Sequence, residues 1–80
     1  MIDEILEPYD LVENINWKGT FKDGQFFVSQ YMPNLQGYSV KGLNNDRKPR
    51  LISRFILEED IKRCNKIENS KLLEPYMEGK

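Results

Sequence analysis

The chain has 80 residues, of which 39% are hydrophobic and 31% are charged, and its formal net charge at pH 7 is −1. This length predicts one small domain over residues 1–80, and the apolar content excludes a disordered polyelectrolyte. The near-neutral charge is not that of a nucleic-acid polycation, and no apolar run approaches the roughly 20 residues of a membrane span. A single cysteine, Cys64, excludes an internal disulfide and is typical of a protein in a reducing cytoplasm.

The composition also points to an origin. Alanine is absent, whereas the chain holds seven Asn, seven Ile and eight Lys. AT-rich coding produces this bias, because Asn, Ile and Lys codons are rich in A and T while Ala codons are rich in G and C. Such coding is typical of small genes of bacteriophages and other mobile elements, for which the cytoplasm would be that of the host cell.

Charge is distributed unevenly along the chain. Residues 1–16 hold five acidic residues and no basic one, whereas residues 17–54 hold seven basic residues and two acidic ones. This asymmetry indicates either an interaction surface or two elements that neutralise each other within one fold.

The spacing of apolar residues predicts a short N-terminal helix over residues 7–14. Apolar side chains recur at helical intervals at Ile2, Ile5, Leu6, Tyr9 and Val12. Pro8 would break a continuous helix but suits a first helical position, so the helix is expected to begin near it.

The dipeptide Asp23-Gly24 predicts a β-hairpin in the centre of the chain. It tolerates the positive φ angles of a two-residue turn, and it lies between residues 17–22 and 25–31, which are rich in aromatic side chains. The turn would set the register and pair Phe21 with Phe26. One face of the hairpin would then belong to the core, with Trp17, Phe21, Phe26 and Val28. The other face would present Lys18, Thr20, Lys22, Phe27, Ser29 and Tyr31.

Two more strands and a second helix complete the prediction. Residues 38–43 and 50–56 are rich in β-forming residues and are separated by a polar turn. Residues 57–67 keep helical spacing, with acidic residues in the first turn and basic residues toward the end. The predicted fold class is therefore α+β, a four-stranded antiparallel β-meander with a short N-terminal helix and a C-terminal helix packed on one face.

The residues that catalysis or metal binding would need are scarce. Histidine is absent, so no imidazole can activate a Ser, Thr or Cys nucleophile. Cys64 lies on the apolar stripe of the predicted second helix and is interpreted as a small buried hydrophobe. Zinc would need four soft or imidazole ligands, and the glycines form no phosphate-binding motif. The sequence thus predicts a non-enzymatic protein without a cofactor or a metal.

Recognition by a surface remains. The second face of the predicted sheet combines basic residues with aromatic and branched apolar ones, namely Lys18, Lys22, Lys41, Arg50, Arg54, Phe27, Tyr31, Ile52 and Ile56, with Arg47 and Lys48 at the rim. Single-stranded nucleic-acid platforms and protein interfaces both use such combinations. Alternatively, a terminal helix covers this face and its apolar residues belong to the core.

The charge balance favours a protein partner, because a pI of about 5.4 is low for a nucleic-acid-binding domain. The predicted function is a small protein-binding module, a phage or mobile-element accessory protein that binds and inhibits a larger host macromolecular machine. The alternative is a single-stranded nucleic-acid-binding domain. Phe27 and Tyr31 would anchor the contact. Basic residues would steer and orient it, namely Lys18, Lys22, Arg47, Lys48, Arg50 and Arg54.

A short segment near the start of the chain is almost repeated near its end, at residues 5–9 and 72–76. Five residues are too few for a structural repeat, which needs units of roughly 20–50. Chance or similar local packing accounts for the match, or both segments occupy equivalent places in a symmetric dimer. The chain is therefore expected to be a monomer or a homodimer.

Overall fold

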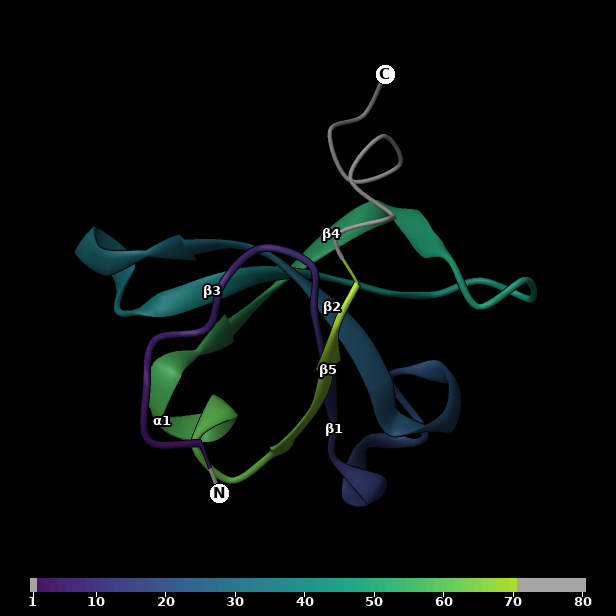
Figure 1. The fold of residues 1–80 in the computed structure, drawn as a ribbon, viewed down its shortest axis with the longest axis horizontal. Helices are drawn as coiled ribbons and strands as arrows, with labels where there is room; N and C mark the ends of the chain where they lie inside the picture. The colour runs from purple at the N-terminus through teal and green to yellow at the C-terminus, as the bar shows by residue number, and fades with distance from the viewer. Residues whose placement is uncertain (1, 71–80) are drawn as a thin grey trace.

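The computed structural model describes residues 2–70, which form a five-stranded antiparallel sheet with the strand order β4-β3-β2-β1-β5 (Figure 1). The strands are β1 (Asp10–Glu13), β2 (Gln25–Met32), β3 (Gly37–Leu43), β4 (Pro49–Leu57) and β5 (Asn65–Asn69). The described range also contains the short helix α1 (Glu58–Ile61) and the 3₁₀ turns η1 (Ile15–Trp17), η2 (Lys22–Gly24) and η3 (Pro33–Leu35). The prediction of a four-stranded meander with an N-terminal and a C-terminal helix is therefore wrong.

Strand β1 replaces the helix predicted over residues 7–14 and lies between β2 and β5. Leu11 and Val12 point to opposite faces of the sheet, and each joins a different core cluster. A helix here would leave the neighbouring edges of β2 and β5 without partners. The helical spacing of Ile2 and Leu6 has another origin, because the irregular segment before β1 lays both side chains on the core.

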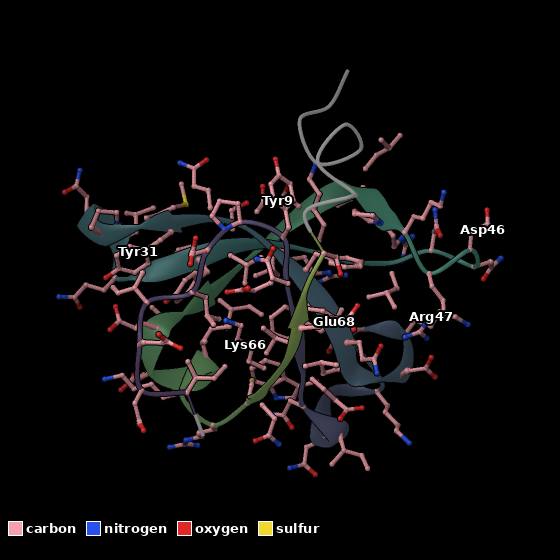
Figure 2. All side chains as sticks on the ribbon, viewed as in Figure 1. Tyr9, Tyr31, Asp46, Arg47, Lys66 and Glu68 are labelled. Atoms are coloured by element: carbon pink, nitrogen blue, oxygen red, sulfur yellow. The ribbon has the colours of Figure 1, made fainter. Side chains whose placement is uncertain are left out.

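A buried carboxylate ties β1 to β5. Asp10 is 1% exposed and accepts hydrogen bonds at 2.8 Å from the backbone N–H of Glu7 and from the side-chain amide of Asn69. The ammonium group of Lys66 lies 3.6 Å from the same carboxylate, and Figure 2 labels Lys66 and Glu68 on β5. A buried charge is tolerated when it is paired and hydrogen-bonded in this way. These partners favour a strand over residues 65–69.

The helix predicted over residues 57–67 is likewise wrong, because α1 ends after one turn. The backbone N–H of Cys64 donates to the carbonyl of Ile61 at 2.9 Å in the turn that follows. Both side chains are fully buried, so the apolar stripe seen in the sequence is present up to this point. Beyond it the chain pairs with β1, whose open edge would otherwise lack hydrogen-bond partners.

A compact loop, not a strand, connects β1 to β2, so the strand predicted over residues 17–22 is wrong. Asp23 and Gly24 do adopt positive φ angles, 59° and 70°, as the predicted turn requires. However, the backbone N–H of Asn14 donates to the carbonyl of Gly24 at 2.8 Å, which closes loop 14–24 onto the end of β1. Strand β2 therefore pairs with β1 and not with the residues immediately before the turn.

A bulge in β2 separates two side chains that regular alternation would place together. The pairing with β3 shifts between Val28 and Gln30, so Ser29 is an extra residue on β2. One extra residue reverses the alternation of faces beyond it. Phe27 consequently points to one face of the sheet and Tyr31 to the other.

The sheet carries a core cluster on each face. The larger cluster contains Ile2, Leu6, Val12, Phe21, Phe26, Val28, Tyr38, Val40, Ile61 and Cys64, and Trp17, Tyr31 and Ile56 pack against it. The smaller cluster contains Leu11, Phe27 and Leu43, with Tyr9 beside it. The residues that the sequence assigned to the core face of the hairpin all belong to, or pack against, the larger cluster.

The first copy of the near repeat, residues 5–9, leads the chain into β1. Leu6 is 2% exposed, and its backbone N–H donates to the hydroxyl of Tyr38 at 3.0 Å. Tyr9 has a φ of 75°, and its N–H donates to the carbonyl of Val28 at 2.8 Å. The second copy, residues 72–76, lies outside the described residues, so equivalent places in a dimer stay a prediction.

Candidate partner-binding groove

Strand β4 carries four large apolar side chains that are exposed. Leu51 is 87% exposed and Ile52 67%, while Phe55 and Leu57 are 46% and 44% exposed. Within residues 2–70, β4 pairs with β3 alone, so its other edge is open. Open sheet edges are ordinarily shortened, charged or covered, so exposed apolar side chains on such an edge indicate an interaction surface.

A groove runs between β4 and the loop that connects β1 to β2. Its first hollow, of about 370 Å³, is lined by Trp17, Thr20, Phe21, Arg54, Phe55, Ile56, Leu57 and Asp60. A second hollow, of about 50 Å³, shares Thr20, Phe21 and Arg54 with the first and is lined also by Lys22, Gly42, Leu43, Arg50 and Ile52. We call the two adjoining hollows the β4 groove.

Aromatic packing fixes the loop side of the groove. The ring centre of Phe26 lies 6.0 Å from that of Trp17, in a stacked arrangement, and 4.9 Å from that of Phe21. Both distances lie within the range of favourable aromatic pairs. The side chain of Asn14 caps η1 by accepting a hydrogen bond from the N–H of Asn16 at 2.9 Å. The loop that forms this wall is thus held in place by the packing of Trp17 and Phe21 on Phe26 and by the cap of Asn14 on η1.

The second hollow is basic. Lys22, Arg50 and Arg54 line it, and its lining includes no acidic residue. The guanidinium carbon of Arg54 lies 6.0 Å from the centre of the Phe21 ring, which is a cation–π distance. Asp60 lines the first hollow. The β4 groove therefore has apolar lining in both hollows, and its positive charge is concentrated in the second.

The structure brings together three of the eight predicted partner-binding residues, Lys22, Arg50 and Arg54. Lys18 is exposed at the end of η1 but lines neither hollow. Phe27 is 2% exposed and lies in the smaller core cluster, on the other face of the sheet. In this position Phe27 stabilises the core and does not reach the surface.

Tyr31 connects β2 to α1. Its hydroxyl donates to the carboxylate of Glu58 at 2.7 Å, and its ring centre lies 4.9 Å from that of Tyr38. The hydrogen bond to Glu58 raises the pKa of the Tyr31 hydroxyl, and burial raises it to a smaller extent. Figure 2 shows Tyr31 on the opposite side of the molecule from Arg47. Tyr31 packs against the larger core cluster and Phe27 belongs to the smaller one, so the two predicted aromatic anchors lie on opposite faces of the sheet.

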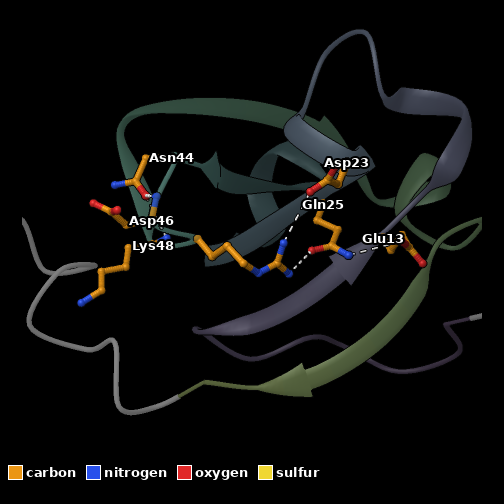
Figure 3. A network of polar contacts seen from close by, with 7 residues as sticks. Glu13, Asp23, Gln25, Asn44, Asp46 and Lys48 are labelled. Carbon is orange, nitrogen blue, oxygen red and sulfur yellow. Dashed lines mark hydrogen bonds and ion pairs between the residues drawn. The ribbon is translucent and has the colours of Figure 1, made fainter.

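Arg47 and Lys48 lie in the turn between β3 and β4, within a network of polar contacts (Figure 3). Arg47 Nη1 is 3.4 Å from the carboxylate of Asp23, and Nη2 donates to the side-chain oxygen of Gln25 at 2.8 Å. The side-chain oxygen of Asn44 accepts a hydrogen bond from the backbone N–H of Lys48 at 3.0 Å. The contacts of Arg47 tie this turn to the start of β2.

Sequence reasoning did not assign Trp17, Phe21 and Leu57 to the binding surface, although all three line the β4 groove. One signal in the sequence could have indicated an apolar surface here. Adjacent apolar residues at 51–52 and 55–57 cannot all face one side of a strand, because successive side chains alternate. If one face of an edge strand packs on the core and the other faces solvent, some apolar side chains of residues 51–52 and 55–57 must be exposed.

Cys64 does not present a reactive thiol. It is fully buried, and burial raises the pKa of the thiol, although the side-chain amide of Asn14, 3.7 Å from Sγ, lowers it. A protonated, buried thiol is a poor nucleophile and a poor metal ligand. In the part of the chain that the structure describes, no three His, Cys, Asp or Glu side chains gather where they could hold a metal ion.

We expect Cys64 to react with Ellman's reagent only through transient unfolding. The thiol of the native protein should react at least about a hundredfold more slowly than that of the denatured protein, because the reagent reaches it only in opened states. The measurement is the absorbance of the released thiolate over time, with N-acetylcysteine as the control for a free thiol. Equal rates for native and denatured protein would show that Cys64 is accessible and would contradict its place in the core.

No family model matches the chain, and no curated protein and no solved structure matches it. Among residues 2–70, no helix is long and apolar enough to cross a membrane. The function therefore has to be inferred from the β4 groove itself.

Proposed function

We propose that the chain is a protein-binding module whose β4 groove receives an extended segment of a partner protein that carries both acidic and apolar side chains. The observation that carries this proposal is the combination of exposed apolar residues on β4 with three cations, Lys22, Arg50 and Arg54. Burial of apolar surface drives association, and a guanidinium group can bind a carboxylate at two points. The half-buried Trp17 on the opposite wall belongs to the residue type most enriched among interface anchors.

A single-stranded nucleic acid is less well supported as the ligand. Stacking platforms need exposed rings along the strand that they bind. Phe27 is buried, and the ring of Tyr31 packs against that of Tyr38. The net charge of −1 also lacks the one-sided positive field of such domains. Inhibition of a larger host machine, and a phage or mobile-element origin, stay predictions from the sequence.

The proposal is tested with a labelled peptide that alternates Glu and Leu over the length of β4. We expect saturable binding with a dissociation constant in the micromolar range. Binding is monitored by fluorescence anisotropy and by the emission of Trp17, which is the sole tryptophan of the chain. The double substitution of Lys22→Glu with Arg50→Glu should weaken binding about tenfold or more, because the new carboxylates of the groove repel the glutamates of the peptide.

The matched control reverses two charges outside the groove, Lys62→Glu with Arg63→Glu. Both residues are exposed and line neither hollow, so peptide affinity should change by less than about twofold. A labelled oligo-dT strand serves as the nucleic-acid arm at about 50 mM salt. Binding of the oligonucleotide without binding of the peptide would overturn the proposal, as would equal losses of peptide affinity in the two double variants.

A further inference from the structure

Pairing with β3 determines which backbone groups of β4 face outward. At the end of the β3–β4 ladder, the backbone N–H of Glu58 donates to the carbonyl of Gln36 at 2.8 Å. In an antiparallel pair, the backbone N–H and C=O of one residue point toward the paired strand, and those of the next residue point away from it. Ile56 and Arg54, two and four residues earlier, therefore direct their backbone groups toward β3. The backbone groups that face away from β3 are those of Ser53, Phe55 and Leu57.

The first half of β4 has features that usually protect an edge strand, namely Pro49 and a register shift before Ser53, whereas residues 53–57 pair regularly with β3. Natural edges are protected by charged side chains, especially lysine, by proline or by bulges. Residues 53–57 contain no proline, Arg54 is their one charged residue, and their pairing with β3 is regular, since the register shift lies before Ser53. Phe55 and Leu57 are 46% and 44% exposed. Among residues 2–70 no other strand pairs with this outward edge, so the regular run 53–57 is a template for another strand.

We propose that two copies of the chain pair antiparallel through β4, with Phe55 of one copy opposite Phe55 of the other. Phe55 is the middle residue of the regular run 53–57, so this register pairs every outward-facing residue with an outward-facing residue of the second copy. Ser53 lies opposite Leu57 of the second copy, and Arg54 lies opposite Ile56. The same surface serves both copies, so the interface is closed by a two-fold axis.

The charges of the two strands are complementary in this arrangement. No two like charges stand directly opposite each other within the run 53–57, where they would destabilise the pair. Strand β4 has Arg50 near its start and continues directly into the acidic first turn of α1, residues 58–60. Because the strands run in opposite directions, the basic start of each β4 lies toward the acidic end of the other. Self-pairing therefore brings opposite charges together at both ends of the interface.

This pairing does not rest on the proposed function, since it uses the backbone edge of β4 and needs no ligand. Its register is tested by disulfide cross-linking between two single variants, Ser53→Cys and Leu57→Cys. Residues directly opposite each other in a hydrogen-bonded antiparallel pair have Cα atoms about 5.5 Å apart, which a disulfide can bridge. Under mild oxidation with oxidised glutathione, an equimolar mixture should give a cross-linked dimer, whereas each variant alone should stay uncross-linked.

The control mixes Ser53→Cys with Ile67→Cys, which places the second thiol on β5, at the other edge of the sheet. This mixture should give no dimer above the background of random collisions. Cross-linking of Ser53→Cys with itself would show a different register and would overturn the proposed one. Equal cross-linking in both mixtures would show that the contact is not specific to β4.

Sedimentation equilibrium of the unmodified chain tests association without the introduced cysteines. We expect a reversible monomer–dimer equilibrium, and we expect Phe55→Lys to raise the dissociation constant about tenfold or more, because two lysines would then face each other across the axis. Ile67→Lys is the matched substitution on the other edge and should leave the constant unchanged. A chain that stays monomeric at all accessible concentrations, or that loses its dimer equally in both variants, would contradict pairing through β4.

Discussion

Replacing Phe26 with alanine is expected to lower the free energy of unfolding by about 3–5 kcal/mol, the range found for large aromatic side chains removed from a packed core. Phe26 is 0% exposed, belongs to the larger core cluster and packs against the rings of Trp17 and Phe21. The loss is comparable to the whole stability of a domain of this size. The measurement is urea unfolding monitored by circular dichroism. We expect the variant to be unfolded, or nearly so, before urea is added.

The matched control for Phe26→Ala is Leu51→Ala. Leu51 is 87% exposed on β4, so its truncation should change the free energy of unfolding by no more than about 0.5 kcal/mol. Comparable losses in the two variants would mean that Phe26 does not lie in the core. Such a result would place β2 in a different register from the one described.

Replacing Gly24 with alanine is expected to cost about 2–3 kcal/mol, the second largest effect. Gly24 has a φ of 70°, which disfavours a side chain, and an added Cβ would collide with the backbone oxygen of Asn14. The collision would disturb the hydrogen bond that closes loop 14–24 onto β1. Because this loop forms one wall of the β4 groove, the variant should also lose affinity for the alternating Glu-Leu peptide.

Gly19→Ala is the control within the same loop. No atom lies within 4 Å of a Cβ added at Gly19, and its φ is not in the positive region. This substitution should leave both the midpoint of thermal unfolding and the peptide affinity nearly unchanged. If Gly24→Ala proved as well tolerated as Gly19→Ala, the closure of the loop onto β1 would be wrong.

Local patterns in the sequence were sufficient to predict β3 and β4. The strands expected over residues 38–43 and 50–56 correspond to Gly37–Leu43 and Pro49–Leu57. Both predictions depended on runs of β-forming residues bounded by polar or glycine-containing turns, which act within a few residues. The positive φ angles of Asp23 and Gly24 were predicted for the same reason, because the dipeptide itself favours them.

Strands β1 and β5 could not be predicted in this way, because each is stabilised by the other. Asp10 in β1 binds the side chains of Asn69 and Lys66 in β5, which are more than fifty residues away along the chain. Considered alone, residues 7–14 and 57–67 have the spacing of amphipathic helices. Pairing at long range overrides such local preferences whenever it satisfies more backbone groups.

The candidate site was predicted in part. Arg50 and Arg54 were expected beside Lys22, and the structure places all three around the second hollow. The expected anchor Phe27 lies on the other face, and no residue type marks the bulge at Ser29 that separates it from Tyr31. Basic residues near one another on adjacent elements were therefore easier to predict than the face on which a particular ring lies.

The most direct test of the central claim, that the β4 groove binds a partner segment, is a nuclear magnetic resonance titration of the ¹⁵N-labelled chain with the alternating Glu-Leu peptide. We predict that the largest shift changes occur at the indole of Trp17 and at the backbone amides of Lys22, Ile52 and Arg54. The amides of β5, on the far edge of the sheet, should stay in place. Changes concentrated in β5, or spread evenly over the molecule, would contradict a binding site in the β4 groove.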